Sequence, residues 1–527
     1  MDALFLPLAS ALGASVDQIK LVFCLLVAYP LGSVFIRVPS SQPSLRHLFN
    51  IAVALFFFSV LKLYSAFLQL LGSVVGTYLI AKYDRSAKMP WVVFAFVMGH
   101  LTINHAIRAI YGFGYETMEV TGPQMVLTMK LTTFAWNVWD GRRPTEDLDK
   151  WQLSKRITRY PSLLEFLGYA FYFPGVLVGP YLDYQEYNEV VHETIFKTAE
   201  VRNKAKSNGR LIPTGRKRVA YRKMMMGLLF LGVFVLLGGS HNYFTILTPW
   251  FSSKPLLNRL MIFQSYGFLE RSKYYAIWTL TEGASILTGL GFTGFGSGGE
   301  SNWDGAANVK VLQIELAPNF KVLLDSWNMK TNVWLRECVY KRVTPKGKKP
   351  GFRSSMLTFL TSAFWHGIAA GYYMTFVMGG FITSVARTAR TNIRPLLLPG
   401  PNEQPSFAKQ LYDIGGILLT VIIVNYATVP FMILNIKDSI RAWTILGWYG
   451  HIIVFGALTL FSVGGTKYFR GLQKKRGILQ STGTGAKGAK VNGNGNGSVS
   501  GGSGTSTPVE KKNMMVPPTL DGLAQRK

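Results

Sequence analysis

The sequence is poor in charged residues, in acidic residues and in cysteine. Only 16% of its 527 residues are charged, against roughly 25% in a typical soluble domain, and 27 Asp and Glu stand beside 56 Lys and Arg. The two cysteines, Cys24 and Cys338, are too few for the disulfide framework of a secreted protein. Hydrophobic residues make up 49% of the chain. They arrive in blocks longer than soluble cores require, which argues against a water-soluble enzyme and predicts a polytopic membrane protein.

Apolar blocks of about 20 residues predict helices that cross a bilayer. The clear candidates are 20–38, 51–72, 91–113, 223–239, 274–292, 354–370, 371–387, 411–434 and 443–464. Weaker candidates, some of which would be half-spans or re-entrant segments, are 3–15, 73–82, 123–138 and 163–183. We therefore predict an all-α polytopic protein with about eleven transmembrane helices.

Positive charge is concentrated in three connecting segments. Residues 197–223 hold ten Lys or Arg and one acid, residues 330–353 hold eight and one, and residues 467–490 hold seven and none. Loops rich in Lys and Arg stay on the cytoplasmic side of a membrane, so we place all three segments there. Nucleic-acid binding is the alternative interpretation of such runs, but a basic loop between membrane spans is far more often a topology signal.

The last part of the chain differs in composition from the rest. No Phe, Trp or Tyr follows Arg470, and residues 481–507 contain nine glycines interleaved with Ser, Thr and Asn. Such a segment buries too little apolar surface to offset the entropy of ordering. We therefore predict a membrane domain over 1–479 and a disordered Gly/Ser-rich cytosolic tail over 480–527.

Ionisable side chains inside a membrane span are costly, and each is a candidate for function. The candidates are Lys130, Glu282, His366 and the pair His100 and His105. His100 and His105 lie about 140° apart around a helix, so packing between helices fits them better than a metal site. His366 lies in an apolar span just before a cluster of small residues. It is either a general base or a buried histidine hydrogen-bonded to a neighbouring helix.

The basic segment 326–353 carries apolar residues at near-helical intervals, which indicates an amphipathic helix at the cytoplasmic interface. Its interspersed cations are Lys330, Arg336, Lys341 and Arg342. Asn328, at the start of the segment, is able both to donate and to accept hydrogen bonds. Taken alone, Asn328 is better explained as a helix cap or an interfacial residue than as a catalytic one.

Six sequence blocks carry a resemblance to a known family. They are 122-GPQMVLTMKLTTFAWNVWDGRR-143, 172-YFPGVLVGPYLDYQEY-187, 281-TEGASILTGLGFTGFG-296, 302-NWDGAANVK-310, 327-WNMKTNVWLRECVYKR-342 and 365-WHGIAAGYY-373. In this order they resemble the membrane-bound O-acyltransferase family, in particular its fungal lysophospholipid acyltransferase branch. The resemblance implies a helical membrane bundle around a catalytic tunnel that acyl-CoA enters from the cytosol and the lipid acceptor from the bilayer.

The resemblance also implies roles for individual residues. The catalytic pair of the family falls on His366 and Asn328, with Asn332 as the second choice for the asparagine. Asp140 and Glu282 match acidic positions that we carry over as structural or substrate-positioning residues, and Trp365 of the WHG block joins the substrate-binding set. The sterol branch has an FYxDWWN-like block where this chain has SWNMKTN, which argues against a sterol acceptor.

These residues suit direct acyl transfer to the free hydroxyl of a lysophospholipid, which we expect at sn-2. His366 would take the hydroxyl proton, and Asn328 would either orient the imidazole or donate to the thioester oxygen. Lys330, Arg336, Lys341 and Arg342 would contact the coenzyme phosphates. We expect acyl-CoA and lysophospholipid as substrates, no metal or other cofactor, no nucleic acid and no obligate protein partner. We expect the endoplasmic reticulum membrane as the location.

Three alternatives stay open on the sequence alone. An acyl-enzyme route would use Cys338, whose thiol needs an activating environment. Another acceptor, a protein or a neutral lipid, would keep the family but change the substrate. A transporter would use the buried polar groups as a pathway, although the chain shows no internal repeat of the kind many transporters have.

Overall fold

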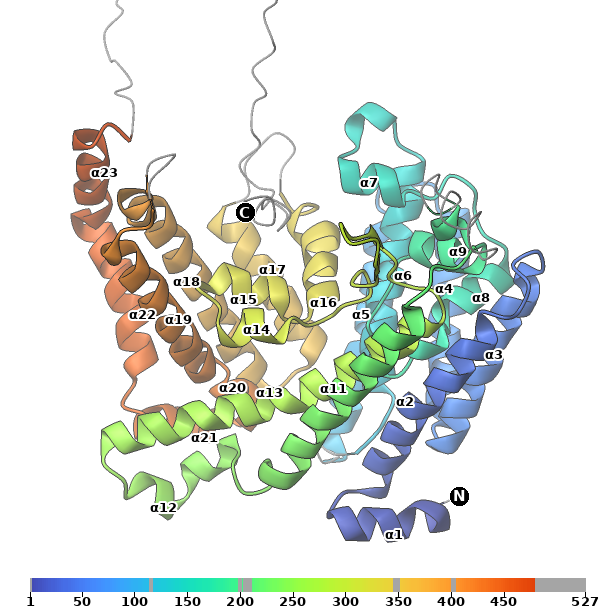
Figure 1. Ribbon diagram of the computed structural model, residues 1–527, viewed down its shortest axis with the longest axis horizontal. Coiled ribbons are helices and arrows are strands. Elements are labelled where there is room, and N and C mark those ends of the chain that lie inside the picture. The colour runs from blue at the N-terminus through green and yellow to red at the C-terminus, as the bar shows by residue number, and fades with distance from the viewer. Residues whose placement is uncertain are drawn as a thin grey trace, which may run out of the picture. The chain divides into compact units, whose positions relative to one another are not determined.

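The computed structural model describes residues 2–112, 117–197, 201, 211–344, 351–399 and 404–478 (Figure 1). The chain divides into two units, Met1–Leu479 and Gln480–Lys527. The predicted disordered tail over 480–527 lies outside the described residues. The regular secondary structure of the described part is helical apart from two short antiparallel strands, β1 (Gly294–Phe295) and β2 (Ser301–Asn302).

The first half of the described chain contains long helices followed by short ones. The α-helices are α1 (Asp2–Leu12), α2 (Val16–Phe35), α3 (Pro43–Val60), α4 (Tyr64–Tyr83), α5 (Met89–Ile110), α6 (Thr121–Gly141), α7 (Lys150–Lys155), α8 (Leu163–Ala170) and α9 (Tyr184–Val191). Single 3₁₀ turns lie at Thr145–Asp147, Phe173–Gly175 and Thr194–Phe196.

The second half begins with two long helices that run side by side in Figure 1. Its α-helices are α11 (Arg216–Leu237), α12 (Pro249–Ser252), α13 (Leu256–Leu287), α14 (Val311–Glu315), α15 (Phe320–Ser326), α16 (Met329–Trp334), α17 (Phe352–His366), α18 (Ala370–Asn392), α19 (Phe407–Ala427), α20 (Val429–Ile433), α21 (Ile436–Ile445), α22 (Tyr449–Leu460) and α23 (Thr466–Lys475). Further turns are 3₁₀ at Tyr243–Leu247 and Arg394–Leu397, and π-helical at Leu335–Tyr340 and Phe461–Gly465.

Within the described residues, seven helical segments are long and apolar enough to cross a membrane, as in a multi-pass membrane protein. They are Val16–Phe35, Pro43–Val60, Tyr64–Tyr83, Met89–Ile110, Arg216–Leu237, Phe407–Ile433 and Tyr449–Lys475. The predicted spans 20–38, 91–113, 223–239 and 411–434 each overlap one of these segments. The all-helical prediction is confirmed.

The predicted span 51–72 is wrong as a single crossing, and the weaker candidate 163–183 is not a full span. The apolar stretch 51–72 is divided between α3 and α4, because the chain turns at Lys62, which has a φ of 59° and an ion pair to Asp2 at 2.7 Å. The stretch 163–183 holds only the eight residues of α8, followed by a 3₁₀ turn and non-helical backbone. Hydropathy registers how apolar a stretch is and is insensitive to a turn within it.

Helix α6 and the second half of α13 are surrounded by other parts of the protein. Most side chains of α6 are buried, and the second half of α13 is buried almost throughout. A β-carbon added at Gly227 of α11 would lie 2.7 Å from Leu280 of α13. Close approach of this kind is what small residues allow between membrane helices. Polar side chains on such helices contact other protein residues. They lower the mean hydropathy of the helix, although the helix stays within the bundle.

Candidate active site

A cavity of about 620 Å³ brings the two predicted catalytic residues together. Its lining includes both Asn328, at the start of α16, and His366, at the end of α17. Other lining residues come from α5, α6, α13 and α18. In the described bundle α17 packs against α5 and α18, and α16 packs against α6 (Figure 1). The volume is typical of a site for a small organic ligand.

His366 is held by ring contacts. Its imidazole lies 4.6 Å from the ring of Trp365, 5.2 Å from Phe376 and 4.9 Å from Phe431, measured between ring centroids. Neither imidazole nitrogen makes a hydrogen bond to any residue of the described chain. The aromatic contacts hold the imidazole at the cavity wall.

The residue after His366 must be glycine. Gly367 ends α17 with a φ of 139°, a value that side chains disfavour. A β-carbon there would lie 3.2 Å from Tyr372 and 3.4 Å from the Nδ1 of His105. The glycine of the WHG block thus lets α17 stop directly after the histidine and lets α5 approach it.

Asn328 has a left-handed backbone, with a φ of 44°, which asparagine tolerates better than most residues. Its side-chain Oδ1 accepts hydrogen bonds from the Nδ2 of Asn308 at 3.1 Å and from the hydroxyl of Thr331 at 2.8 Å. Within the described residues its Nδ2 has no acceptor. The oxygen of the amide is therefore engaged, and its amino group is the end left for a ligand.

Lys330 is the one of the four predicted phosphate-binding cations that lines the cavity. Its Nζ lies 3.3 Å from Glu186, which Lys155 also approaches at 3.4 Å. Burial raises the pKa of the Glu186 carboxyl, but the charges of Lys330 and Lys155 outweigh it and hold the pKa below its usual range. The carboxylate stays ionised and tethers Lys330 at the cavity wall.

Trp365 also lines the cavity and is almost completely buried. Its indole Nε1 donates to the backbone carbonyl of Met125 at 3.0 Å, and its own carbonyl lies 3.3 Å from the Nε2 of His105. These bonds connect the end of α17 to α6 and α5. Trp365 therefore anchors the segment that carries His366, in addition to forming part of the wall.

Comparison with known proteins decides the family. Residues 106–429 match the profile of the membrane-bound O-acyltransferase family. The chain belongs to the membrane-bound O-acyltransferase family. A lysophospholipid acyltransferase of Schizosaccharomyces pombe is 40% identical over 464 residues, covering 88% of this chain and 89% of the relative. That of Saccharomyces cerevisiae is 36% identical, covering 90% and 79%, and the human membrane-bound glycerophospholipid O-acyltransferase 2 is 30% identical, covering 87% of each chain.

The other predicted cations of this membrane-bound O-acyltransferase are paired with acids. Arg342 makes two hydrogen bonds to the carboxylate of Asp140, at 2.9 and 2.5 Å, and its guanidinium lies 4.2 Å from the Trp136 ring. The side chain of Arg342 is 7% exposed and that of Asp140 is completely buried. Neither residue lines the cavity. The pair joins the segment after α16 to the end of α6.

Lys341 and Arg336 are more exposed and do not line the cavity either. Lys341 lies 2.7 Å from Asp149 and 2.6 Å from Glu337, and Arg336 lies 2.9 Å from Glu337. The predicted interfacial helix over 326–353 is shorter than expected. It consists of α16 and the π-helical turn Leu335–Tyr340, and residues 345–350 lie outside the described chain.

The Asp140–Arg342 pair makes a prediction about stability. Replacing Asp140 by Asn leaves a buried guanidinium without a counter-charge, and breaking a buried pair in this way costs about 3–5 kcal/mol. We expect D140N to lower the temperature at which the detergent-solubilised protein loses its monodisperse elution peak. The control is D149N at the exposed pair with Lys341, where the expected loss is about 0–1 kcal/mol. Equal melting of D140N and wild type would return Arg342 to the candidates for phosphate binding.

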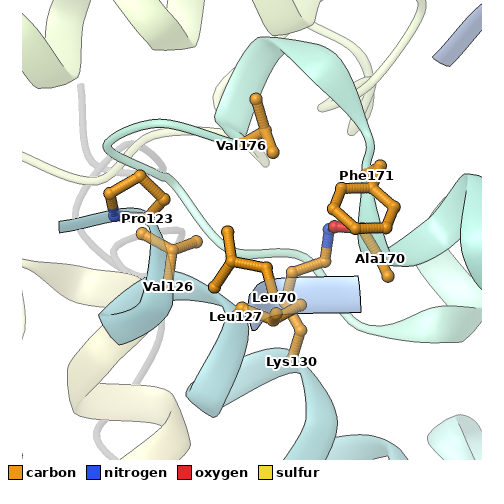
Figure 2. Close-up of a pocket in the computed structure, with 8 residues that line it drawn as sticks. All are labelled: Leu70, Pro123, Val126, Leu127, Lys130, Ala170, Phe171 and Val176. Atoms are coloured by element: carbon orange, nitrogen blue, oxygen red, sulfur yellow. The ribbon is translucent and has the colours of Figure 1, made fainter. Parts of the chain in front are cut away.

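Two buried ionisable residues lie away from the cavity. Glu282 of α13 is completely buried and lies 2.8 Å from Lys223 of α11. Lys130 of α6 donates to the carbonyls of Tyr169 and Ala170 at the end of α8. Figure 2 shows Lys130 beside a separate cavity of about 10 Å³, about the size of one water molecule. Glu282 connects α13 to α11, and Lys130 hydrogen-bonds the C-terminal end of α8.

Cys338 is poorly placed for an acyl-enzyme route. It is completely buried, does not line the cavity, and its sulfur lies 3.5 Å from the hydroxyl of Thr133. Burial raises the pKa of its thiol to about 12, so the thiol does not ionise near neutral pH. A thiolate, not a thiol, is the nucleophile in such chemistry.

The structure adds cavity residues that sequence reasoning did not single out. His105 was expected only to pack between helices, yet it lines the cavity as well as contacting Trp365. His100 does pack, with its Nδ1 2.7 Å from Ser73 of α4. Asn308 lies in the sequence block 302–310 and was given no role, although its side-chain amide donates to Asn328. In the described chain no group of three or more His, Cys, Asp or Glu is arranged to hold a metal ion.

Proposed function

We propose that this protein transfers a fatty acyl chain from acyl-CoA to the free sn-2 hydroxyl of a lysophospholipid, with His366 as general base and Asn328 as hydrogen-bond donor. The enzyme is an acyl-CoA-dependent lysophospholipid acyltransferase, and both fungal relatives are named lysophospholipid acyltransferases. The observation that carries the residue roles is the single cavity lined by both side chains. The function falls in phospholipid synthesis and remodelling.

The reaction needs one proton acceptor and one stabilised oxygen. A nitrogen of His366 takes the proton of the lysophospholipid hydroxyl while that oxygen attacks the thioester carbon. The C–S bond then breaks, an ester C–O bond forms, and the imidazolium returns its proton to the departing CoA thiolate. No covalent enzyme intermediate is required, in keeping with the position of Cys338 outside the cavity lining. The surrounding aromatic rings exclude water that would hydrolyse the thioester.

Asn328 has two conceivable roles, and its hydrogen bonds favour one of them. Orienting the imidazole would require a bond to His366, and no such bond exists within the described residues. Its Oδ1 is already engaged by Asn308 and Thr331. The remaining Nδ2 group suits donation to the thioester oxygen, which gains negative charge in the transition state.

The cavity wall offers both a cation and apolar surface, which suit the phosphates and the acyl chain of acyl-CoA. Lys330 is a candidate contact for a coenzyme phosphate, with Arg336 and Lys341 outside the cavity as further electrostatic partners. Trp365 contributes apolar surface toward the acyl chain. Asp140, Glu282 and Arg342 support substrate binding through the ion pairs that hold their helices.

The membrane arrangement that we propose has about eleven crossings around a catalytic tunnel. Helices α6, α13, α17 and α18, added to the seven apolar segments, give that number. Buried polar residues lower the hydropathy of α6 and α13. The positive charge of the basic connections supports a cytosolic C-terminal tail. As the location of the protein we propose the endoplasmic reticulum membrane.

An assay of microsomes tests the substrate class. Microsomes from cells that express the chain and lack their own lysophospholipid acyltransferase activity receive labelled oleoyl-CoA and a panel of lysophospholipids. We expect acceptor-dependent formation of labelled phospholipid. Label transferred only to protein or to a neutral lipid would replace the acceptor. Uptake of acyl-CoA without any transfer would favour a transporter and overturn the proposal.

A further inference from the structure

A hydrogen bond joins the side chains of Asn308 and Asn328 at the cavity wall. Asn308, in the segment between β2 and α14, is buried and lines the cavity beside Asn328. Its Oδ1 accepts from the backbone N–H of Lys330 at 2.9 Å, and its Nδ2 donates to the Oδ1 of Asn328 at 3.1 Å. In addition, the backbone N–H of Met329 donates to the Asn308 carbonyl at 2.9 Å.

The backbone bond determines the direction of the whole series. A backbone N–H only donates, so the oxygen of the Asn308 amide must face Lys330. Its amino group, which also only donates, then faces Asn328, and Asn328 must present its own oxygen in return. The hydroxyl of Thr331 donates to that same oxygen at 2.8 Å. The Asn328 amide consequently has one orientation, with its Nδ2 left over.

We infer that Asn308 is a positioning residue that makes Asn328 a hydrogen-bond donor toward the thioester oxygen. This inference rests on the proposed function, since it assigns the orientation of a residue proposed to act on the substrate. A flipped Asn328 would present an oxygen to the developing negative charge and oppose the reaction. Asn308 therefore acts on catalysis through Asn328 and does not touch the reacting atoms.

The sharpest test is Asn308→Asp, which preserves shape. One carboxylate oxygen still accepts from Lys330, but the other no longer donates, so Asn328 must rotate and donate its own Nδ2 to it. Loss of a preorganised donor lowers kcat by about 10²-fold or more. We expect a decrease in kcat of that order in purified, detergent-solubilised enzyme, with the KM for acyl-CoA unchanged, because the interaction operates only in the transition state.

A less disruptive variant is Asn308→Ala. It removes the bond to Asn328 while the hydroxyl of Thr331 still donates to the same oxygen, so we expect a smaller decrease in kcat than for Asn308→Asp. A purely structural role predicts the opposite ranking, since Asp resembles Asn more closely than Ala does. If Asn308→Asp gives no monodisperse protein, Asn308→Ala carries the test in its place.

A double-mutant cycle separates positioning from structure. In the Asn328→Ala background either substitution at Asn308 should cause no further loss of kcat, because the residue it positions is gone. Multiplicative losses would overturn the inference. Wild-type kcat for the Asn308 variants, with Asn328→Ala impaired, would overturn it and leave the proposed function intact. Wild-type kcat for Asn328→Ala itself would refute the proposed role of Asn328 and, with it, the inference.

Discussion

Replacing His366 by Ala should reduce acyl transfer by about 10²–10⁴-fold, the contribution of a positioned general base. His366 borders the cavity with neither nitrogen hydrogen-bonded within the described chain. The other cavity histidine, His105, has its Nε2 3.3 Å from the carbonyl of Trp365. His366 is thus the cavity histidine whose ring nitrogens make no hydrogen bond to the described residues.

The measurement is the rate of labelled phospholipid formation in microsomes, at equal amounts of membrane-inserted protein. His100→Ala is the matched control, because His100 packs against Ser73 outside the cavity lining and should keep its activity. If H366A turns over within a few-fold of wild type, another group removes the proton. A loss in both variants would indicate a general effect of removing a histidine from the bundle.

Part of this candidate site could be proposed from the sequence. The motif blocks identified Asn328 and His366, and the structure places both on one cavity, although a loop and a helix separate them in the chain. The role that we propose for Asn328 could not be predicted. It depends on a bond from Asn308, which lies 20 residues away in a segment with no helical periodicity to relate the two positions.

The predicted phosphate-binding cations show a different limit. When the acidic partner of a Lys or Arg is distant in the chain, the sequence alone does not reveal the pairing, and the side chain is taken for an unpaired cation. Arg342 is paired with Asp140, 202 residues away, and Lys341 with Asp149, 192 residues away. The segment therefore carries less free positive charge than its composition indicates. Only the folded chain reveals that Lys330, itself paired with Glu186, is the one of the four predicted cations that lines the cavity.

The prediction of the helices was limited in a similar way. The length of the apolar blocks located the apolar parts of α2, α5, α11 and α19. It gave only a weak signal for α6, whose interior includes Lys130 and Asp140, both buried against protein. Helix breaks escape hydropathy altogether, as at Lys62, because the residues on either side of the turn are as apolar as those within the helices.

Replacing Asn328 by Asp should lower kcat by about 10²–10³-fold, the cost of removing one oxyanion donor. The carboxylate still accepts from Asn308 and Thr331, so the side chain keeps both bonds that hold it. Only the donor Nδ2 is exchanged for an oxygen, which would repel the negative charge that develops on the thioester oxygen. Because the ground-state thioester carries no such charge, the KM for acyl-CoA should change far less than kcat.

Asn332 provides the matched control for this result. It lies in the same sequence block, but its Nδ2 donates to the backbone carbonyl of Leu324 at 2.8 Å and it does not line the cavity. Asn332→Asp should therefore affect stability more than kcat. If steady-state kinetics found Asn332→Asp inactive and Asn328→Asp close to wild type, the oxyanion donor would be the other asparagine. A raised KM with unchanged kcat in Asn328→Asp would make Asn328 a binding residue that contacts the thioester equally in the ground state and the transition state.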